Sequence, residues 1–253
     1  MNALTLNPGR LTALGRSELT LLVRNRAALS VALMMPALMV FVLRSTLSGD
    51  TAASVAEATL TGGIGMVLIL VVYMNLVSAY VARREELVLK RLRTGEAGDL
   101  EILAGTALPA AVIALGQIAV LALAGAAALD APMPDNPLLL AGAVLAALPV
   151  LAGLAAVTSA FTRNVESAGI TTLPLFLLTA LGSGLFLPLD VLPDAVADAC
   201  ELLPLSGVMA LVRAAWTGGA TGGELLTAAL TTLAWIMVTV FAVQRWFRWE
   251  PRR

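Results

Sequence analysis

The sequence predicts an all-helical integral membrane protein whose chain crosses the bilayer about six times. Of its 253 residues, 59% are hydrophobic and only 13% are charged, and the mean hydropathy is +0.90. Soluble domains carry about 25% charged residues, so this chain has too little polar surface to coat a water-soluble globule of its size. Long apolar stretches and an uneven distribution of Lys and Arg between them support the same fold class.

Each of the long apolar stretches is sufficient to form a membrane-spanning helix. A helix rises 1.5 Å per residue and the hydrocarbon core is about 30 Å thick, so a span needs roughly 20 mostly apolar residues. The stretches that meet this requirement are about 27–47, 60–82, 107–129, 138–161, 170–189 and 224–246. No stretch has the composition of a soluble domain, so we expect residues 1–253 to form a single transmembrane domain.

The charged residues of the connections predict the orientation of the chain. All of the 16 Lys and Arg residues except Arg44 and Arg213 lie before the first span, after the second, after the fourth or after the sixth. The other connections collect carboxylates instead, among them Asp130, Asp190 and Glu224. Because positive residues favour the cytoplasmic side of a bilayer, both termini are expected in the cytoplasm.

Residues 9–24 predict an interfacial helix ahead of the first span. The five leucines of this segment fall within one arc of a helix, with Glu18 among them, whereas Arg16 and Arg24 lie on the other side. Such a helix would lie flat on the cytoplasmic leaflet, with its Arg side chains near lipid phosphates. The alternative is a frayed polar lead-in to the first span.

Residues 83–103, RREELVLKRLRTGEAGDLEIL, predict a short charged helix between the second and third spans. Leucines are interleaved with Arg, Lys and Glu, and Gly95 and Gly98 break the helix. Asp99 is a candidate N-cap for the helix that continues into the third span. On the residues alone, a helix that binds a partner and a plain anchor loop remain equally open.

Residues 188–223 are too apolar for an open loop and too interrupted for one helix. Pro193 and Pro204 prevent a continuous helix. A re-entrant pair of short helices at about 190–216 would satisfy both observations, because irregular backbone is tolerated in a membrane where protein buries it. Two amphipathic helices that cap the surface are the alternative.

The chemistry that the sequence lacks excludes several classes of protein. Histidine is absent, which removes the most common metal ligand and general base, and Cys200 is the only cysteine. There is no G-x-x-x-x-G-K-[ST] loop to hold ATP phosphates. A net charge of −1 provides no basic field for nucleic acid. We therefore expect no catalytic, cofactor or metal site in this chain and no nucleic-acid partner.

The spans contain essentially no Asp, Glu, Lys or Arg near their centres. Buried charge of that kind is typical of ion-coupled carriers, and clustered His, Asp or Glu would be needed by an enzyme that acts on lipid. Both alternatives are therefore disfavoured, and any transport must draw its energy from outside the chain. A membrane scaffold or regulatory protein that binds a partner through residues 84–93 stays open.

Two segments carry a resemblance to a known family. One is the loop from Arg84-Glu85-Glu86-Leu87 to Gly95, and the other runs from Phe161 to Leu205 and includes Gly182-Ser183-Gly184-Leu185-Phe186-Leu187-Pro188. They resemble the loop between spans 2 and 3, and the stretch from span 4 to span 6, in ABC-2 type permeases. These are the membrane subunits of ATP-binding-cassette exporters, such as the daunorubicin-resistance type. The loop departs from the family at Leu87-Val88, where many relatives have Gly-Thr.

The resemblance implies that ATP is hydrolysed by a separate polypeptide. Two permease subunits, expected as a homodimer, would pair above two ATPase subunits, which hold the ATP and Mg. The loop at 84–93 would be the coupling helix, whose leucines fill a groove of the ATPase while its charges pair at the rim. The interfacial helix would also touch the ATPase. The residues expected to contact the ATPase are Glu85, Glu86, Leu87, Leu89, Lys90, Leu92 and Arg93.

The resemblance also implies a pathway between the two permease subunits, lined mainly by the second and fifth spans. The segment at 190–216 would shape its outer gate. A pathway without charge favours an amphipathic, drug-like or lipid-like substrate that is exported across the cytoplasmic membrane, although the family also exports polysaccharides. The candidate pathway residues are Met66, Tyr73, Asn75, Leu173, Phe176 and Phe186.

Overall fold

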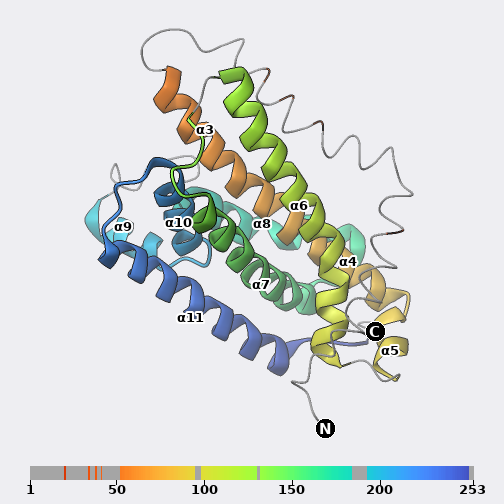
Figure 1. Ribbon diagram of the computed structural model, residues 1–253. Helices are drawn as coiled ribbons and strands as arrows, with labels where there is room; N and C mark the ends of the chain where they lie inside the picture. The colour runs from red at the N-terminus through yellow and green to blue at the C-terminus, as the bar shows by residue number, and fades with distance from the viewer. Residues whose placement is uncertain are drawn as a thin grey trace.

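The computed structural model describes residues 52–94, 98–129, 132–183 and 193–250, together with Thr20, Met34, Leu38 and Phe41. These residues form helices joined by short connections, and no strand occurs among them (Figure 1). The all-helical fold predicted from composition is therefore confirmed for this part of the chain. In chain order the helices are α3 (Ala52–Val67), η1 (Leu68–Met74), α4 (Asn75–Glu85), α5 (Val88–Arg93), α6 (Asp99–Leu129), α7 (Pro137–Phe161), α8 (Val165–Gly182), α9 (Asp194–Glu201), α10 (Ser206–Thr217) and α11 (Gly222–Trp246).

Within the described residues, five helical segments are long and apolar enough to cross a membrane. They are Glu57–Glu85, Asp99–Ala128, Pro137–Phe161, Val165–Gly182 and Gly222–Trp246. They correspond to the last five predicted spans. The predicted first span at 27–47 and the predicted interfacial helix at 9–24 lie outside the described residues, apart from isolated positions.

The first of these five segments is composite, because α3, η1 and α4 follow one another without a break. The middle part, η1, is a π-helix, in which the hydrogen bonds skip one more residue than in an α-helix. Leu68, Ile69, Val72 and Tyr73 of η1 are all buried. Single-turn π-bulges inside α-helices occur frequently at functional sites.

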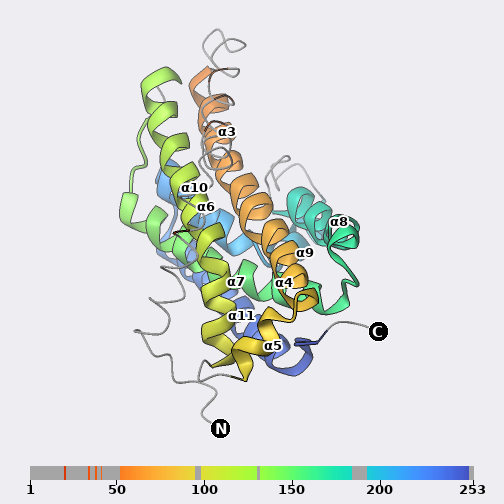
Figure 2. The same cartoon turned by 90° about the vertical axis from the view of Figure 1, so that its right-hand side faces the viewer.

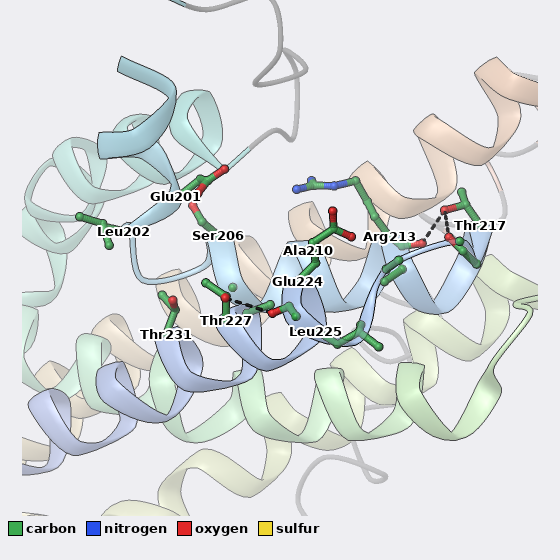
Figure 3. Close-up of a pocket in the computed structure, with 17 residues that line it drawn as sticks. Glu201, Leu202, Ser206, Ala210, Arg213, Thr217, Glu224, Leu225, Thr227 and Thr231 are labelled. Carbon is green, nitrogen blue, oxygen red and sulfur yellow. Dashed lines mark hydrogen bonds between the residues drawn. The ribbon is translucent and has the colours of Figure 1, made fainter. Parts of the chain in front are cut away.

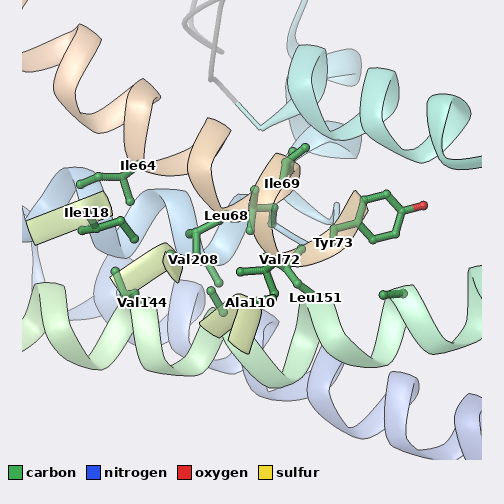
Figure 4. Packing of buried hydrophobic residues seen from close by; sticks show 14 of the residues in the cluster. Ile64, Leu68, Ile69, Val72, Tyr73, Ala110, Ile118, Val144, Leu151 and Val208 are labelled. Carbon is green, nitrogen blue, oxygen red and sulfur yellow. The ribbon is translucent and has the colours of Figure 1, made fainter. Parts of the chain in front are cut away.

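The core lies where α7 crosses the other helices. α7 packs against η1, α4, α10 and α11. Leu68 and Val72 point from η1 toward α7, where Leu151 is buried, and Val208 of α10 joins the same cluster (Figure 4). This cluster is formed by apolar side chains at the centre of the bundle, away from the lipid-facing surface.

Three helix starts are set by local sequence. The side chain of Asn136 accepts a hydrogen bond from the first turn of α7. Asn164 and Ser167 form a reciprocal capping box at the start of α8, and Thr221 and Glu224 form another at the start of α11. Each cap satisfies main-chain N–H groups that have no partner within the helix. The helix starts are therefore encoded locally, even though the spans themselves are encoded by composition.

The segment before the last span forms two short helices, as predicted. α9 and α10 meet at 89°, and the break between them contains Pro204. The end of α10 is tied to the start of α7, because Asn136 N donates to Ala215 O at 2.9 Å. Whether the pair dips into the bilayer or caps it stays a prediction.

The two ends of the bundle are distinct. α11 has 25 residues, so it is about 37 Å long. It runs from beside α9 to beside α5, which places the α9–α10 pair at the opposite end of the bundle from α5 (Figure 1).

Candidate functional site

Arg84 fixes the last turn of α4 to the end of α7. Its side chain is only 1% exposed, and its guanidinium donates to the main-chain oxygens of Ser159 and Thr162 at 2.7 Å each. A longer bond of 3.4 Å reaches Arg163 O. The last carbonyls of a helix lack a full set of intrahelical partners and carry partial negative charge, so a buried cation is stabilised there. Arg84 therefore joins the ends of two spans directly before the charged loop.

The chain turns between α4 and α5 at Glu86 and Leu87. Leu87 adopts a φ of 60°, in the left-handed region, and α5 begins at the next residue. This conformation costs about 1–2 kcal/mol for a residue with a side chain, whereas glycine adopts it freely. Position 87 nevertheless carries a leucine, whose side chain is 40% exposed.

α5 buries one of the leucines that were expected to contact the ATPase. Leu89 is 0% exposed, while Leu92 is half-buried. Leu89 therefore presents no surface to another protein in this structure, and its contact with the ATPase stays a prediction. Leu89 instead anchors α5 to its own subunit.

The residues that follow α11 pack against α4 and α5 (Figure 2). The ring of Phe247 meets Tyr80 edge-to-face at 6.1 Å and Trp249 at 4.9 Å. Arg93 of α5 lies over the Trp249 ring, with 4.7 Å between Cζ and the ring centroid. Tyr80 also donates to Leu103 O of α6 at 3.1 Å. These contacts connect α4, α5, α6 and the segment after α11.

Two ion pairs orient the exposed charges of α5. Lys90 Nζ lies 2.8 Å from Glu250 Oε1, and Arg93 Nε lies 3.0 Å from Asp99 Oδ1. Exposed pairs of this kind contribute about 0–1 kcal/mol. Asp99, a candidate N-cap in the sequence, is instead the first residue of α6 and binds Arg93, while Glu101 accepts from Gly98 N. The sequence did not predict the contacts that residues 247–250 make with α4 and α5, because nothing in the sequence singles out these residues.

A mixed polar and apolar surface remains at this end of the bundle. We define the coupling surface as residues 85–87 together with 90–94. Glu85, Glu86, Leu87 and Arg91 are exposed on it. No group of three metal-binding side chains occurs in the described part of the chain. The coupling surface is thus suited to contact with another protein, and ATPase contact by its residues stays a prediction.

The pathway candidates of the second span divide into two kinds. Met66 is half-buried and Asn75 is exposed, so both have surface that a substrate could reach. Tyr73 is 1% exposed, and its hydroxyl lies 3.1 Å from Thr158 Oγ1 of α7. Tyr73 therefore links two spans within one subunit, and the structure does not place it on an open face.

The pathway candidates of the fifth span lie on α8 or beyond it. Leu173 is exposed and Phe176 is half-buried, and α8 packs beside α4 and η1. Phe186 lies outside the described residues. The structure thus places the helices of the second and fifth predicted spans side by side. That their candidate residues line a pathway stays a prediction.

These features define a polytopic helical membrane protein with a short charged helix held at one end of its bundle. The ABC-2 type transporter family model matches residues 10–216, which include the coupling surface and all of α10 except its last residue. The chain belongs to the ABC-2 type transporter family. It is the permease component of an ABC transporter, and members of this family work with an ATPase subunit. No curated protein matches the sequence.

Proposed function

We propose that this chain is the membrane subunit of an ATP-driven exporter in the cytoplasmic membrane, with both termini and α5 in the cytoplasm. Two copies of the chain pair, and two ATPase subunits bind beneath them with ATP and Mg. The substrate is an amphipathic, drug-like or lipid-like molecule, because the spans contain essentially no central charge.

The observation that carries this proposal is the rigid attachment of an exposed helix to several spans. α5 is exposed at Lys90, Arg91 and Arg93, yet Leu89 anchors it from within. Arg84 ties the preceding helix to α7 through two 2.7 Å hydrogen bonds. A force on the coupling surface therefore reaches α4 and α7 without first bending a flexible loop.

The attachment suggests how ATP binding moves the spans. Closure of the ATPases pushes α5, α4 carries the motion into η1, and Arg84 transfers it to α7. The segment after α11 couples the last span to the same motion through Trp249 and Arg93. A second copy of the chain would move in the opposite sense, so that the space between the copies opens alternately on each side.

The test uses the exposed leucine at the turn. Leu87→Asp removes its apolar surface while keeping a residue type that tolerates positive φ. We expect Leu87→Asp combined with Leu92→Asp to lower both co-purification with the ATPase and ATP turnover in lipid about tenfold or more, since about 1.4 kcal/mol of lost contact corresponds to a factor of ten.

Two controls separate contact from folding. Leu87→Gly removes the side chain but favours the backbone conformation, and Val196→Asp places the same charge on an exposed position of α9 at the opposite end. Val196→Asp should leave ATP turnover unchanged. ATPase binding and turnover at wild-type levels in the Leu87→Asp, Leu92→Asp variant would exclude the coupling surface as the ATPase contact. Failure of the wild-type chain to associate with an ATPase would favour a membrane scaffold.

A further inference from the structure

A pocket of about 760 Å³ lies at the end of the bundle opposite α5. It is formed by the end of α9, one side of α10 and the first turns of α11 (Figure 3). Its volume falls in the range of small-molecule sites, about 300–1,000 Å³. Ser206, Thr217, Thr227 and Thr231 contribute hydroxyl groups to the lining. The pocket is therefore large enough for a polar headgroup and polar enough to bind one.

The pocket contains a guanidinium with unused hydrogen-bonding capacity. Arg213 lines it from α10 and is half-buried. Its Nη1 donates to Ser183 O at 3.2 Å, and among the described residues it forms no ion pair. A guanidinium offers five N–H donors in a planar fork that matches a phosphate. Arg213 is also the one Lys or Arg residue in the connection between the fifth and sixth predicted spans.

Two carboxylates face the same space. Glu201 ends α9 and Glu224 lies in the first turn of α11, and both are exposed. Arg213 and Glu224 reach from α10 and α11 into the pocket, with Glu201 at its far end (Figure 3). One oxygen of Glu224 accepts from Thr221 N at 2.9 Å, which leaves the other for a ligand. A cation-binding and an anion-binding group are thus presented side by side without neutralising each other.

The pocket also has apolar lining. Leu202 after the end of α9 and Leu225 of α11 lie among the polar groups that line it, and Leu202 is 69% exposed. A ligand whose head occupies the pocket would therefore place the start of an apolar tail against Leu202.

We propose that this pocket binds a membrane phospholipid whose headgroup carries a phosphate and a primary ammonium. The phosphate binds Arg213, the ammonium binds Glu201 and Glu224, and an acyl chain leaves the pocket past Leu202. A headgroup with a quaternary ammonium lacks the N–H donors for the carboxylates, and one with only a phosphate leaves both carboxylates without a cation. This site is independent of ATPase coupling, because it is formed by the permease alone.

Lipid binding to the purified permease tests the proposal without the ATPase. The probes are phosphatidylethanolamine, phosphatidylcholine and phosphatidylglycerol with identical acyl chains, added to the protein in detergent and counted by native mass spectrometry. We expect phosphatidylethanolamine to bind about tenfold more tightly than the other two. Arg213→Gln should weaken the binding of all three lipids, since it deletes the partner of the phosphate that they share.

A second variant tests the carboxylates without disturbing the fold. Glu201→Gln with Glu224→Gln removes both charges, and glutamine at 224 still caps Thr221 N. This variant should lose its preference for phosphatidylethanolamine and bind phosphatidylglycerol at least as well. Glu166→Gln, which removes an exposed carboxylate at the start of α8, is the matched control and should keep the wild-type order.

The outcomes are distinguishable from failure to fold. Each variant is compared with wild type by its thermal unfolding midpoint, which should change little. Glycerophosphoethanolamine, which has the headgroup without acyl chains, should bind at least about 100-fold more weakly than the lipid because it lacks the apolar chain that contacts Leu202. Equal binding of the three lipids by wild type, or binding of the three lipids by the Arg213→Gln variant as tight as by wild type, would overturn the proposal.

Discussion

Arg84→Ala should be strongly destabilising, because it removes the bridge between α4 and α7. Each hydrogen bond of a charged group contributes about 1.5–3 kcal/mol, so the two 2.7 Å bonds to Ser159 O and Thr162 O together account for about 3–6 kcal/mol. The loss also leaves buried carbonyls at the end of α7 without these donors. Arg84→Lys keeps the charge but presents a single nitrogen, so we expect about half of the loss.

The assay is the thermal unfolding midpoint of the purified permease in detergent. A loss of 3–6 kcal/mol should lower the midpoint by about 6 °C or more, at about 2–4 °C per kcal/mol for a chain of this size. Arg83→Ala is the matched control, because Arg83 is adjacent and donates to Thr106 Oγ1 at a longer 3.3 Å. A midpoint for Arg84→Ala within about 2 °C of wild type, or no lower than that of Arg83→Ala, would refute the reasoning.

Two further predictions concern the packing of α7 against α11 and the segment that follows α11. Gly153→Ala should lower the unfolding midpoint, because its Cβ would lie 2.5 Å from Thr239 Cβ between α7 and α11. Gly142→Ala, whose Cβ would meet nothing within 4 Å, should raise the midpoint, because it adds about 0.5–1 kcal/mol to the free energy of unfolding through helix propensity. Midpoint shifts of the same sign in the two variants would contradict this reasoning. Trp249→Ala should lower ATPase-coupled turnover with only a small change in the unfolding midpoint, because it removes the ring over which Arg93 of α5 lies. Trp249→Phe keeps an aromatic ring and should retain most of the turnover. Turnover at the wild-type level in Trp249→Ala would contradict the positioning role.

The span boundaries show how accurately the sequence predicts where each helix begins and ends. The predicted span at 138–161 agrees closely with α7, Pro137–Phe161, because a run of apolar residues is bounded by a local cap at Asn136. The predicted span at 170–189 begins five residues too late, because Asn164 caps α8 and starts it at Val165. A composition window averages over such caps, so it finds the helix but not its first turn.

The inner and outer faces of the helices were much harder to predict. In a soluble protein the apolar stripe of a helix marks the side that is buried. In this chain the lipid-facing side is apolar as well, so Tyr73 and Asn75 seemed equally suitable for a pathway, although one is buried against α7 and the other is exposed. The π-helical turn in η1 likewise left no mark in the sequence.

The sequence by itself determined that this protein lies in a lipid bilayer, how long its spans are, that the chain breaks at Pro204, and that it lacks a nucleotide-binding loop. These properties depend on composition and on local chain chemistry, which neighbours in space do not alter. The tertiary structure alone decided that Arg84 rather than Arg83 bridges two spans, and that Leu89 faces inward while Leu87 faces out. Adjacent residues point about 100° apart on a helix, and only the position of α7 and the segment after α11 selects which direction is the interior.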